Sequence, residues 1–247
     1  MKDQELLRYS RQINLPEFGI ESQQKLKNAS VVIIGMGALG SISSMYLSSA
    51  GVGRIFIVDF DEVELSNLQR QVLYDESDIG KLKVDAAKEK LNLINANVEI
   101  VSIHDKATRK NINEIISEVD IVLDGTDNFD SRFLINKSCV QNKKPLISAA
   151  ITAFEGQILT LKGYERNLPC YECVFPNIGE ENNNCVDNGV LAPLPGVIAS
   201  IQATMCIKLI TNFSPAAFNE MILFSGKEID MRKVKLKKDT DCPVCGK

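Results

Sequence analysis

The stretch from residue 31 to residue 70 constrains the fold more than any other part of this 247-residue chain. Residues 31–34 form a continuous β-branched run, which predicts a buried strand of a parallel sheet. Gly35, Gly37 and Gly40 follow at G-x-G-x-x-G spacing and open an apolar helix. Such a loop lets the backbone approach a phosphate and directs helix N-terminal amides at it. The sequence therefore predicts a nucleotide site at the first strand turn.

Segments typical of strands alternate with segments typical of helices up to about residue 150. This alternation predicts right-handed crossovers and an α/β fold, with a Rossmann-like, mostly parallel sheet flanked by helices. Beyond it, the pattern predicts a polar loop, an apolar helix and a C-terminal antiparallel region. We expect one domain over residues 1–247, with a nucleotide-binding part at 1–150 and a second part at 151–247. The predicted strands after the first are residues 54–58, 98–103, 119–123, 145–149, 156–161, 221–224 and 231–236, and the predicted helices include residues 3–13, 81–93, 112–116 and 196–212.

Charged and amide side chains gather where the predicted strands end, which is where ligands of such sheets bind. The group consists of Asp59, Asp61, Asn67, Arg70, Lys83 and Asp127. Asp59 lies where a carboxylate usually meets a ribose hydroxyl. Arg70 and Lys83 could neutralise a triphosphate, and Asp127 could hold Mg²⁺. The whole group favours ATP over a nicotinamide or flavin dinucleotide, the default ligand of a lone G-x-G-x-x-G loop. Ala38 within the loop still permits close backbone approach.

The charge balance and the apolar segments limit the partners. The net charge is −4 and the pI is about 5.3, which argues against a nucleic-acid or anionic-membrane surface. Pro193, Pro195, Gln202 and Lys208 interrupt the apolar run at residues 190–210, which favours a buried helix over a membrane span. The first residues lack the apolar core of a signal peptide, and we expect a cytoplasmic protein.

Two C-x-x-C pairs, Cys170 with Cys173 and Cys242 with Cys245, carry the strongest metal signal. Two such pairs match one Zn²⁺ ion bound tetrahedrally by four thiolates. Four protein ligands leave no open position, so the expected role is structural. The metal would tie the C-terminus to the central loop across about seventy residues. Chance free thiols and a redox dithiol are the alternatives.

Taken together, these motifs make the chain resemble the ubiquitin-activating-enzyme-like adenylyltransferases of the ThiF/MoeB/HesA family, with a lean toward the ThiF-like members. The resemblance implies a homodimer that adenylates the C-terminal glycine of a small ubiquitin-fold sulfur carrier ending in Gly-Gly. The carrier would be ThiS- or MoaD-like and the product would prime thiocarboxylate formation. The matching segments are residues 8–13 (RYSRQI), 35–40 (GMGALG), 59–61 (DFD), 65–71 (LSNLQRQ), 80–83 (GKLK), 124–128 (DGTDN), 170–173 (CYEC), 185–190 (CVDNGV) and 242–246 (CPVCG).

The resemblance also implies roles for single residues. The ATP site would use the glycine loop together with the acidic and basic residues at the strand ends. Arg11 would reach in from the partner subunit, and residues 151–247 would bind the carrier and zinc. Cys185 matches a cysteine that, in ThiF-like relatives, bonds to the carrier thiocarboxylate through an acyl disulfide; in MoeB-like relatives it is dispensable. A passive loop thiol is the alternative. A cysteine desulfurase or rhodanese-type protein would donate the sulfur.

Three other functions stay open at this point. An NAD-dependent oxidoreductase could use the same fold, although no substrate domain with a proton donor is evident. A non-catalytic partner should have lost charges from the ATP site, whereas this chain keeps them. Adenylation of a different peptide or ubiquitin-like substrate is the third. The sequence also leaves thiamin and molybdopterin biosynthesis open as pathways.

Overall fold

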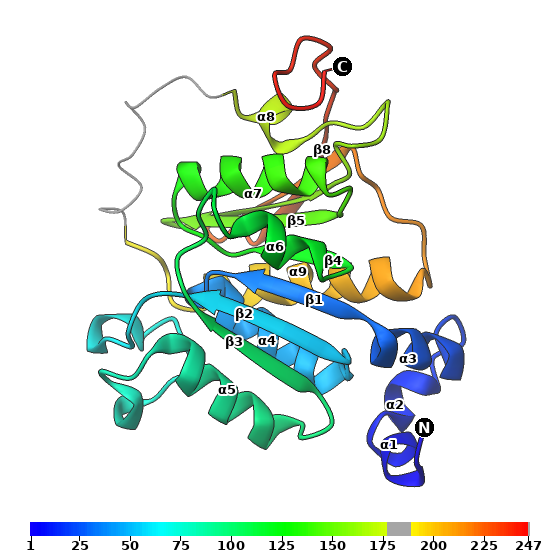
Figure 1. Cartoon of the computed structure of the whole chain (residues 1–247), viewed down its shortest axis with the longest axis vertical. Helices are drawn as coiled ribbons and strands as arrows, with labels where there is room; N and C mark the ends of the chain where they lie inside the picture. The colour runs from blue at the N-terminus through cyan, green and yellow to red at the C-terminus, as the bar shows by residue number, and fades with distance from the viewer. Residues whose placement is uncertain (177–188, 247) are drawn as a thin grey trace.

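The computed structural model describes residues 1–176 and 189–246, and its centre is an eight-stranded sheet of order β3-β2-β1-β4-β5-β6-β7-β8 (Figure 1). Strands β1 to β5 run parallel, and β6, β7 and β8 extend the same sheet in antiparallel pairs. The predicted fold class is therefore confirmed. The strands are β1 (Ser30–Ile34), β2 (Arg54–Asp59), β3 (Glu99–His104), β4 (Ile121–Asp124), β5 (Leu146–Thr152), β6 (Glu155–Leu161), β7 (Glu220–Ser225) and β8 (Asp230–Lys235).

Helices cover both faces of the sheet, because alternate side chains of each inner strand are apolar and point to opposite faces. Val31 and Ile33 of β1 face one core, and Val32 and Ile34 face the other. The first core is closed by α3 (Gly19–Asn28), α4 (Ala38–Ala50), α5 (Lys83–Ile94) and α9 (Leu194–Thr211). The second is closed by α6 (Ile112–Ser117), α7 (Phe129–Gln141) and α8 (Tyr171–Val174).

The N-terminal region differs from the single helix predicted for residues 3–13. It forms α1 (Asp3–Arg8) and α2 (Ser10–Ile13), which meet at the buried Tyr9. The Tyr9 ring packs against Gly51, which ends α4 with a φ of +85°, and a Cβ at Gly51 would lie 2.6 Å from that ring. Asn95 donates a 2.8 Å hydrogen bond to the Tyr9 hydroxyl. These contacts fix the break between the two short helices.

Helix α9 confirms the helix predicted near residues 196–212. It is long and apolar enough to cross a membrane by length and composition alone. In this fold it packs against α4, β5 and β6, and its buried Gln202 donates to the carbonyl oxygens of Asp124 and Ile147. The inward face of α9 is therefore part of the core beside β4 and β5.

Candidate functional site

The glycine loop joins β1 to α4, and its three glycines have different structural roles. Gly35 has a φ of +90°, and a Cβ there would lie 3.0 Å from the backbone of Gly125. Gly37 is the N-cap residue of α4 and faces open space apart from the Gln71 side chain. A Cβ at Gly40 would come 1.9 Å from the Gly35 carbonyl oxygen. Gly40 therefore permits helix–strand packing, while Gly35, Gly37 and Ala38 line the cavity described below.

Asp59, the last residue of β2, holds the loop in place. Its carboxylate accepts hydrogen bonds from the backbone N–H groups of Met36 at 2.6 Å and Asp61 at 2.9 Å. Burial raises the pKa of Asp59 above its usual value, although these two donors and the nearby Lys83 act in the opposite direction. The Tyr74 hydroxyl donates to the Met36 carbonyl oxygen at 2.8 Å. The loop is thus pinned from both sides before any ligand binds.

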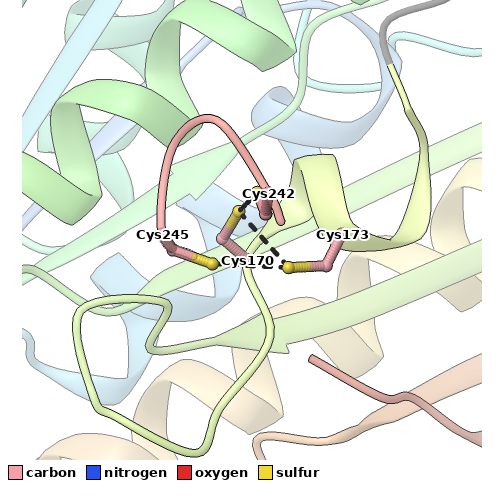
Figure 2. A group of neighbouring side chains, drawn as sticks. All are labelled: Cys170, Cys173, Cys242 and Cys245. Atoms are coloured by element: carbon pink, nitrogen blue, oxygen red, sulfur yellow. Dashed lines mark hydrogen bonds between the residues drawn. The ribbon is translucent and has the colours of Figure 1, made fainter. Parts of the chain in front are cut away.

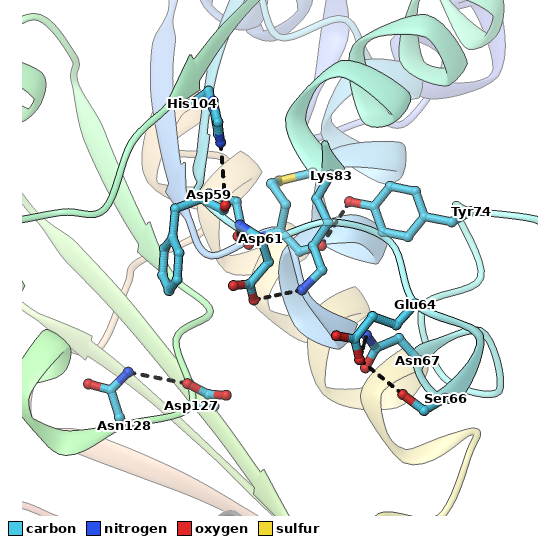
Figure 3. Close-up of polar contacts among 12 residues, drawn as sticks. Asp59, Asp61, Glu64, Ser66, Asn67, Tyr74, Lys83, His104, Asp127 and Asn128 are labelled. Carbon is cyan, nitrogen blue, oxygen red and sulfur yellow. Dashed lines mark hydrogen bonds and ion pairs between the residues drawn. The ribbon is translucent and has the colours of Figure 1, made fainter. Parts of the chain in front are cut away.

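Two predicted cations, Lys83 and Arg70, lie on the β2 side of the site, and Figure 3 shows Lys83 beside Asp61. Lys83 is the first residue of α5 and is only 5% exposed, with its Nζ 2.9 Å from Asp61 Oδ2. Arg70 donates through Nη2 to Asn67 Oδ1 at 3.0 Å, so these two predicted residues are in direct contact. Both cations line the same cavity, so the structure brings them together as the sequence predicts.

Asp127 lies on the turn after β4, apart from the Asp61–Lys83 pair (Figure 3). The buried Asp124 shapes this turn by accepting hydrogen bonds from Ser148 and from the Thr126 backbone and hydroxyl groups. Asn128 caps α7 by accepting from the Ser131 N–H at 2.9 Å. The Asp127 carboxylate remains exposed at the cavity, where it could serve as an oxygen ligand for Mg²⁺.

These elements surround one cavity of about 1430 Å³ at the carboxyl ends of β1, β2, β4 and β5. It continues past the glycine loop and the Asp127 turn along the neighbouring ends of β6, β7 and β8. The predicted residues that line it are Gly35, Gly37, Ala38, Asp59, Asp61, Asn67, Arg70, Lys83 and Asp127. Its far end is lined by Thr152, Glu155, Gln157, Leu223, Ser225, Glu228, Asp230 and Arg232.

The structure does not bring every predicted site residue to this cavity. Arg11 is exposed on α2 and does not line the cavity. Cys185 lies outside the residues that the structure describes, so its role stays a prediction.

Two buried polar residues that line the cavity, Gln71 and Arg132, are not among the predicted site residues. Gln71 is 4% exposed, and its Oε1 has no hydrogen-bond partner among the described residues. Arg132, on the first turn of α7, is 7% exposed, and its Nε likewise has none there. Gln71 stands inside the LSNLQRQ segment, which could have drawn attention to it; Arg132 comes five residues after Asp127, a weaker signal.

The four predicted zinc ligands form a second, separate cluster (Figure 2). Their Sγ atoms lie within 4.8 Å of one another, with 3.6 Å between Cys170 and Cys242 and 3.3 Å between Cys173 and Cys245. Zn–S bonds of about 2.3 Å in a tetrahedron require sulfurs about 3.8 Å apart. Asn136 Nδ2 donates to Cys170 Sγ at 3.5 Å. Hydrogen bonds of this kind orient the thiolates that bind a metal. The cluster fits a metal such as zinc, and its closed ligand set suits a structural site.

Comparison with known proteins shows which proteins this chain resembles. The chain is 41% identical to the molybdopterin-synthase adenylyltransferase of Escherichia coli K12 over 246 residues, covering 100% of this chain and 98% of that protein. It is 38% identical to the sulfur carrier protein ThiS adenylyltransferase of the same organism over 247 residues, covering 100% and 97%. These two identities do not separate the pathways, so the lean toward ThiF-like members stays a prediction.

Longer relatives and solved structures also match. The chain is 44% identical to adenylyltransferase and sulfurtransferase MOCS3 of Culex quinquefasciatus, covering 99% of this chain and 56% of that protein. It thus spans about half the length of this relative. The crystal structure of E. coli MccB with ATP aligns with a TM-score of 0.85 at 30% identity, over 97% of this chain and 75% of that one. The ThiF family matches residues 9–244. Because this match covers nearly all of its length, the chain belongs to the ThiF family.

Proposed function

We propose that this protein uses ATP to adenylate the C-terminal glycine of a small ubiquitin-fold sulfur carrier ending in Gly-Gly. The observation that supports this proposal best is the continuous cavity that extends from the glycine loop to the ends of β6, β7 and β8. Its volume of about 1430 Å³ exceeds the roughly 300–1,000 Å³ of ordinary small-ligand pockets. It has room for a nucleotide at one end and an extended peptide tail at the other.

The names of relatives support this proposal. Two full-length relatives are named adenylyltransferases, one for molybdopterin synthase and one for ThiS. The solved MccB structure is of a complex with ATP, and its fold aligns with 97% of this chain. The MOCS3 name adds sulfur transfer, which supports a later sulfur-donation step by a cysteine desulfurase or a rhodanese-type protein. Cys185 is our candidate for a covalent role in that step.

The chemistry follows from the charges in the cavity. A terminal carboxylate is ionised near pH 7, so it needs no general base to attack the α-phosphorus. A bond forms between a carboxylate oxygen and that phosphorus, and the bond to the bridging oxygen of pyrophosphate breaks. Lys83 and Arg70 line the cavity and would stabilise the charge that develops on the leaving phosphates. Asp127 would hold Mg²⁺, which supplies further positive charge to the triphosphate.

We also propose that the four-cysteine cluster holds one Zn²⁺ ion per chain and that the protein works as a cytoplasmic homodimer. Thiolates that must stay reduced to hold zinc suit a reducing compartment. For the dimer, Arg11 stands exposed on α2, and the apolar side chains of Leu7, Leu15 and Ile20 are exposed nearby in the sequence. A second copy covering this surface would bury them and could receive Arg11 in its own ATP site.

The proposed activity predicts ATP–pyrophosphate exchange that requires both Mg²⁺ and a carrier ending in Gly-Gly. ThiS-like and MoaD-like carriers, each with and without its last glycine, are the substrates to compare. Incorporation of labelled pyrophosphate into ATP measures the reaction. Exchange with neither carrier, or binding of NADH at micromolar concentration without exchange, would contradict the proposal. Exchange with an unrelated peptide alone would favour a different acceptor.

A cation supplied by the partner subunit predicts complementation between inactive variants. Arg11→Ala and Lys83→Ala should each be inactive as homodimers. After subunit exchange, random pairing makes half of the dimers mixed, and one of the two sites in each keeps both cations. About a quarter of the wild-type exchange activity should therefore return. Mixed dimers demonstrated by differential tags but lacking activity would show that Arg11 does not act across the interface.

A further inference from the structure

Arg132 is a buried cation that the proposed reaction has not yet used. It lies on the first turn of α7, is 7% exposed, and lines the cavity beside the turn that carries Asp127. Its Nη2 donates to the Thr126 carbonyl oxygen at 2.8 Å, and its guanidinium carbon lies 5.5 Å from the centre of the Phe129 ring. Both of these groups are neutral.

The charge of Arg132 is unbalanced within the described part of the chain. None of the ion pairs in that part involves Arg132, and its buried Nε has no hydrogen-bond acceptor there. Lys83, the other buried cation of the cavity, differs because it pairs with Asp61 at 2.9 Å. The protein itself therefore supplies a counter-ion for Lys83 but not, among the described residues, for Arg132.

Keeping Arg132 in this position costs the protein free energy. A buried charge without a counter-ion is unfavourable, and a buried donor without an acceptor adds to that cost. The N-terminal end of a helix carries a partial positive charge, so a cation on the first turn of α7 is further disfavoured. An anion bound in the cavity would offset all three effects.

We propose that Arg132 binds an oxyanion of the substrates. This identification of the ligand rests on the proposed function, which supplies two oxyanions: a phosphate of ATP and the terminal carboxylate of the acceptor. The guanidinium group suits either one, because its planar fork donates two parallel hydrogen bonds to oxygens of one anionic group. Bound there, the anion would give Nε its missing acceptor, while Nη2 keeps the Asp127-bearing turn in place through Thr126.

Direct binding measurements distinguish the two anions. The probes are ATP with Mg²⁺ and a synthetic peptide ending in Gly-Gly, prepared with either a free carboxylate or a terminal amide. Calorimetry would compare the wild type with Arg132→Met, Arg132→Lys and the control Arg166→Met, which removes an exposed arginine outside the cavity. Arg132→Met should weaken one anionic probe by about tenfold to a hundredfold, while Arg166→Met binds normally. Loss for ATP identifies a phosphate; loss for the free-acid peptide with unchanged binding of the amide identifies the carboxylate.

The same experiment separates a binding role from a purely structural one. If Arg132 only holds the Thr126 carbonyl, its replacement lowers the melting temperature but leaves the affinity for every probe unchanged, and the proposal is overturned. Arg132→Lys keeps a positive charge without the planar fork, so a measurable loss of affinity for the same anionic probe, with normal binding by Arg166→Met, supports oxyanion binding. This variant decides the matter should Arg132→Met fail to fold. A wild type that binds no probe overturns the proposed function as well.

Discussion

Replacing Lys83 by methionine is expected to lower ATP–pyrophosphate exchange by about a hundredfold to a thousandfold while the protein stays folded. The activity falls because Lys83 is a buried cation of the cavity whose charge faces the proposed triphosphate. The fold survives because the lost ion pair has a half-exposed partner, and pairs of that kind contribute about 1 kcal/mol or less. A cation on the first residue of α5 also opposes the helix dipole, so its removal relieves a small strain on that helix.

Lys88→Met is the matched control for this prediction. Lys88 lies on the same helix but is exposed and outside the cavity, so its replacement should leave exchange and melting temperature unchanged. Circular dichroism and pyrophosphate exchange are measured on both variants. Near-normal exchange by Lys83→Met would remove this residue from the site. A cooperative loss of structure in Lys83→Met would assign the residue a structural role.

Replacing Cys242 by serine is the second change for which we expect a large effect. It should lower the melting temperature by about 10 °C and abolish metal binding. A metal bound by the four cysteines would close the loop between Cys170 and Cys242, which lie 72 positions apart. By the entropy argument used for covalent cross-links, closing a loop of this length stabilises the fold by about 4 kcal/mol. For a chain of this size each kcal/mol corresponds to roughly 2–4 °C.

Elemental analysis and thermal melts test the zinc prediction. The wild type should contain about one zinc per chain, and a strong chelator should lower its melting temperature toward that of Cys242→Ser. Cys139→Ala is the control, because Cys139 is a buried thiol on α7 outside the cluster. It should retain zinc. A stable wild-type protein without any metal would contradict a zinc-stabilised C-terminal region.

The sequence predicted those features that rest on local patterns or on a doubled chemical motif. The apolar run of β1 and the glycine spacing after it are local, and both occur as predicted. The two cysteine pairs lie about seventy residues apart, yet their shared chemistry predicted that Cys170 and Cys242 would meet, which the structure confirms. In each case the residue types alone limit the structure that the segment can form or the ligand that it can bind.

Features that depend on the surroundings could not be predicted. Helix α3 was missed because it has few apolar residues, and its buried Gln23 is satisfied by the Ala50 carbonyl oxygen, a partner 27 residues away. Arg132 was missed because an arginine on the first turn of a helix is ordinarily exposed, and only packing against α7's neighbours buries it. Gly40 was assigned to nucleotide binding, whereas its packing against the Gly35 carbonyl is visible only in three dimensions.

The reversal of strand direction between β5 and β6 gives the two ends of the cavity different freedom to evolve. At the nucleotide end, each wall is a crossover loop that must also dock a helix onto the sheet, as the Gly35–Gly40 contact shows. At the far end, the wall includes the hairpin between β7 and β8, whose β8 side chains are all exposed. Residues of that hairpin can change in sequence without disturbing a helix. If the proposed reaction is correct, acceptor preference can therefore diverge among descendants of such a protein while the adenylating chemistry is inherited unchanged.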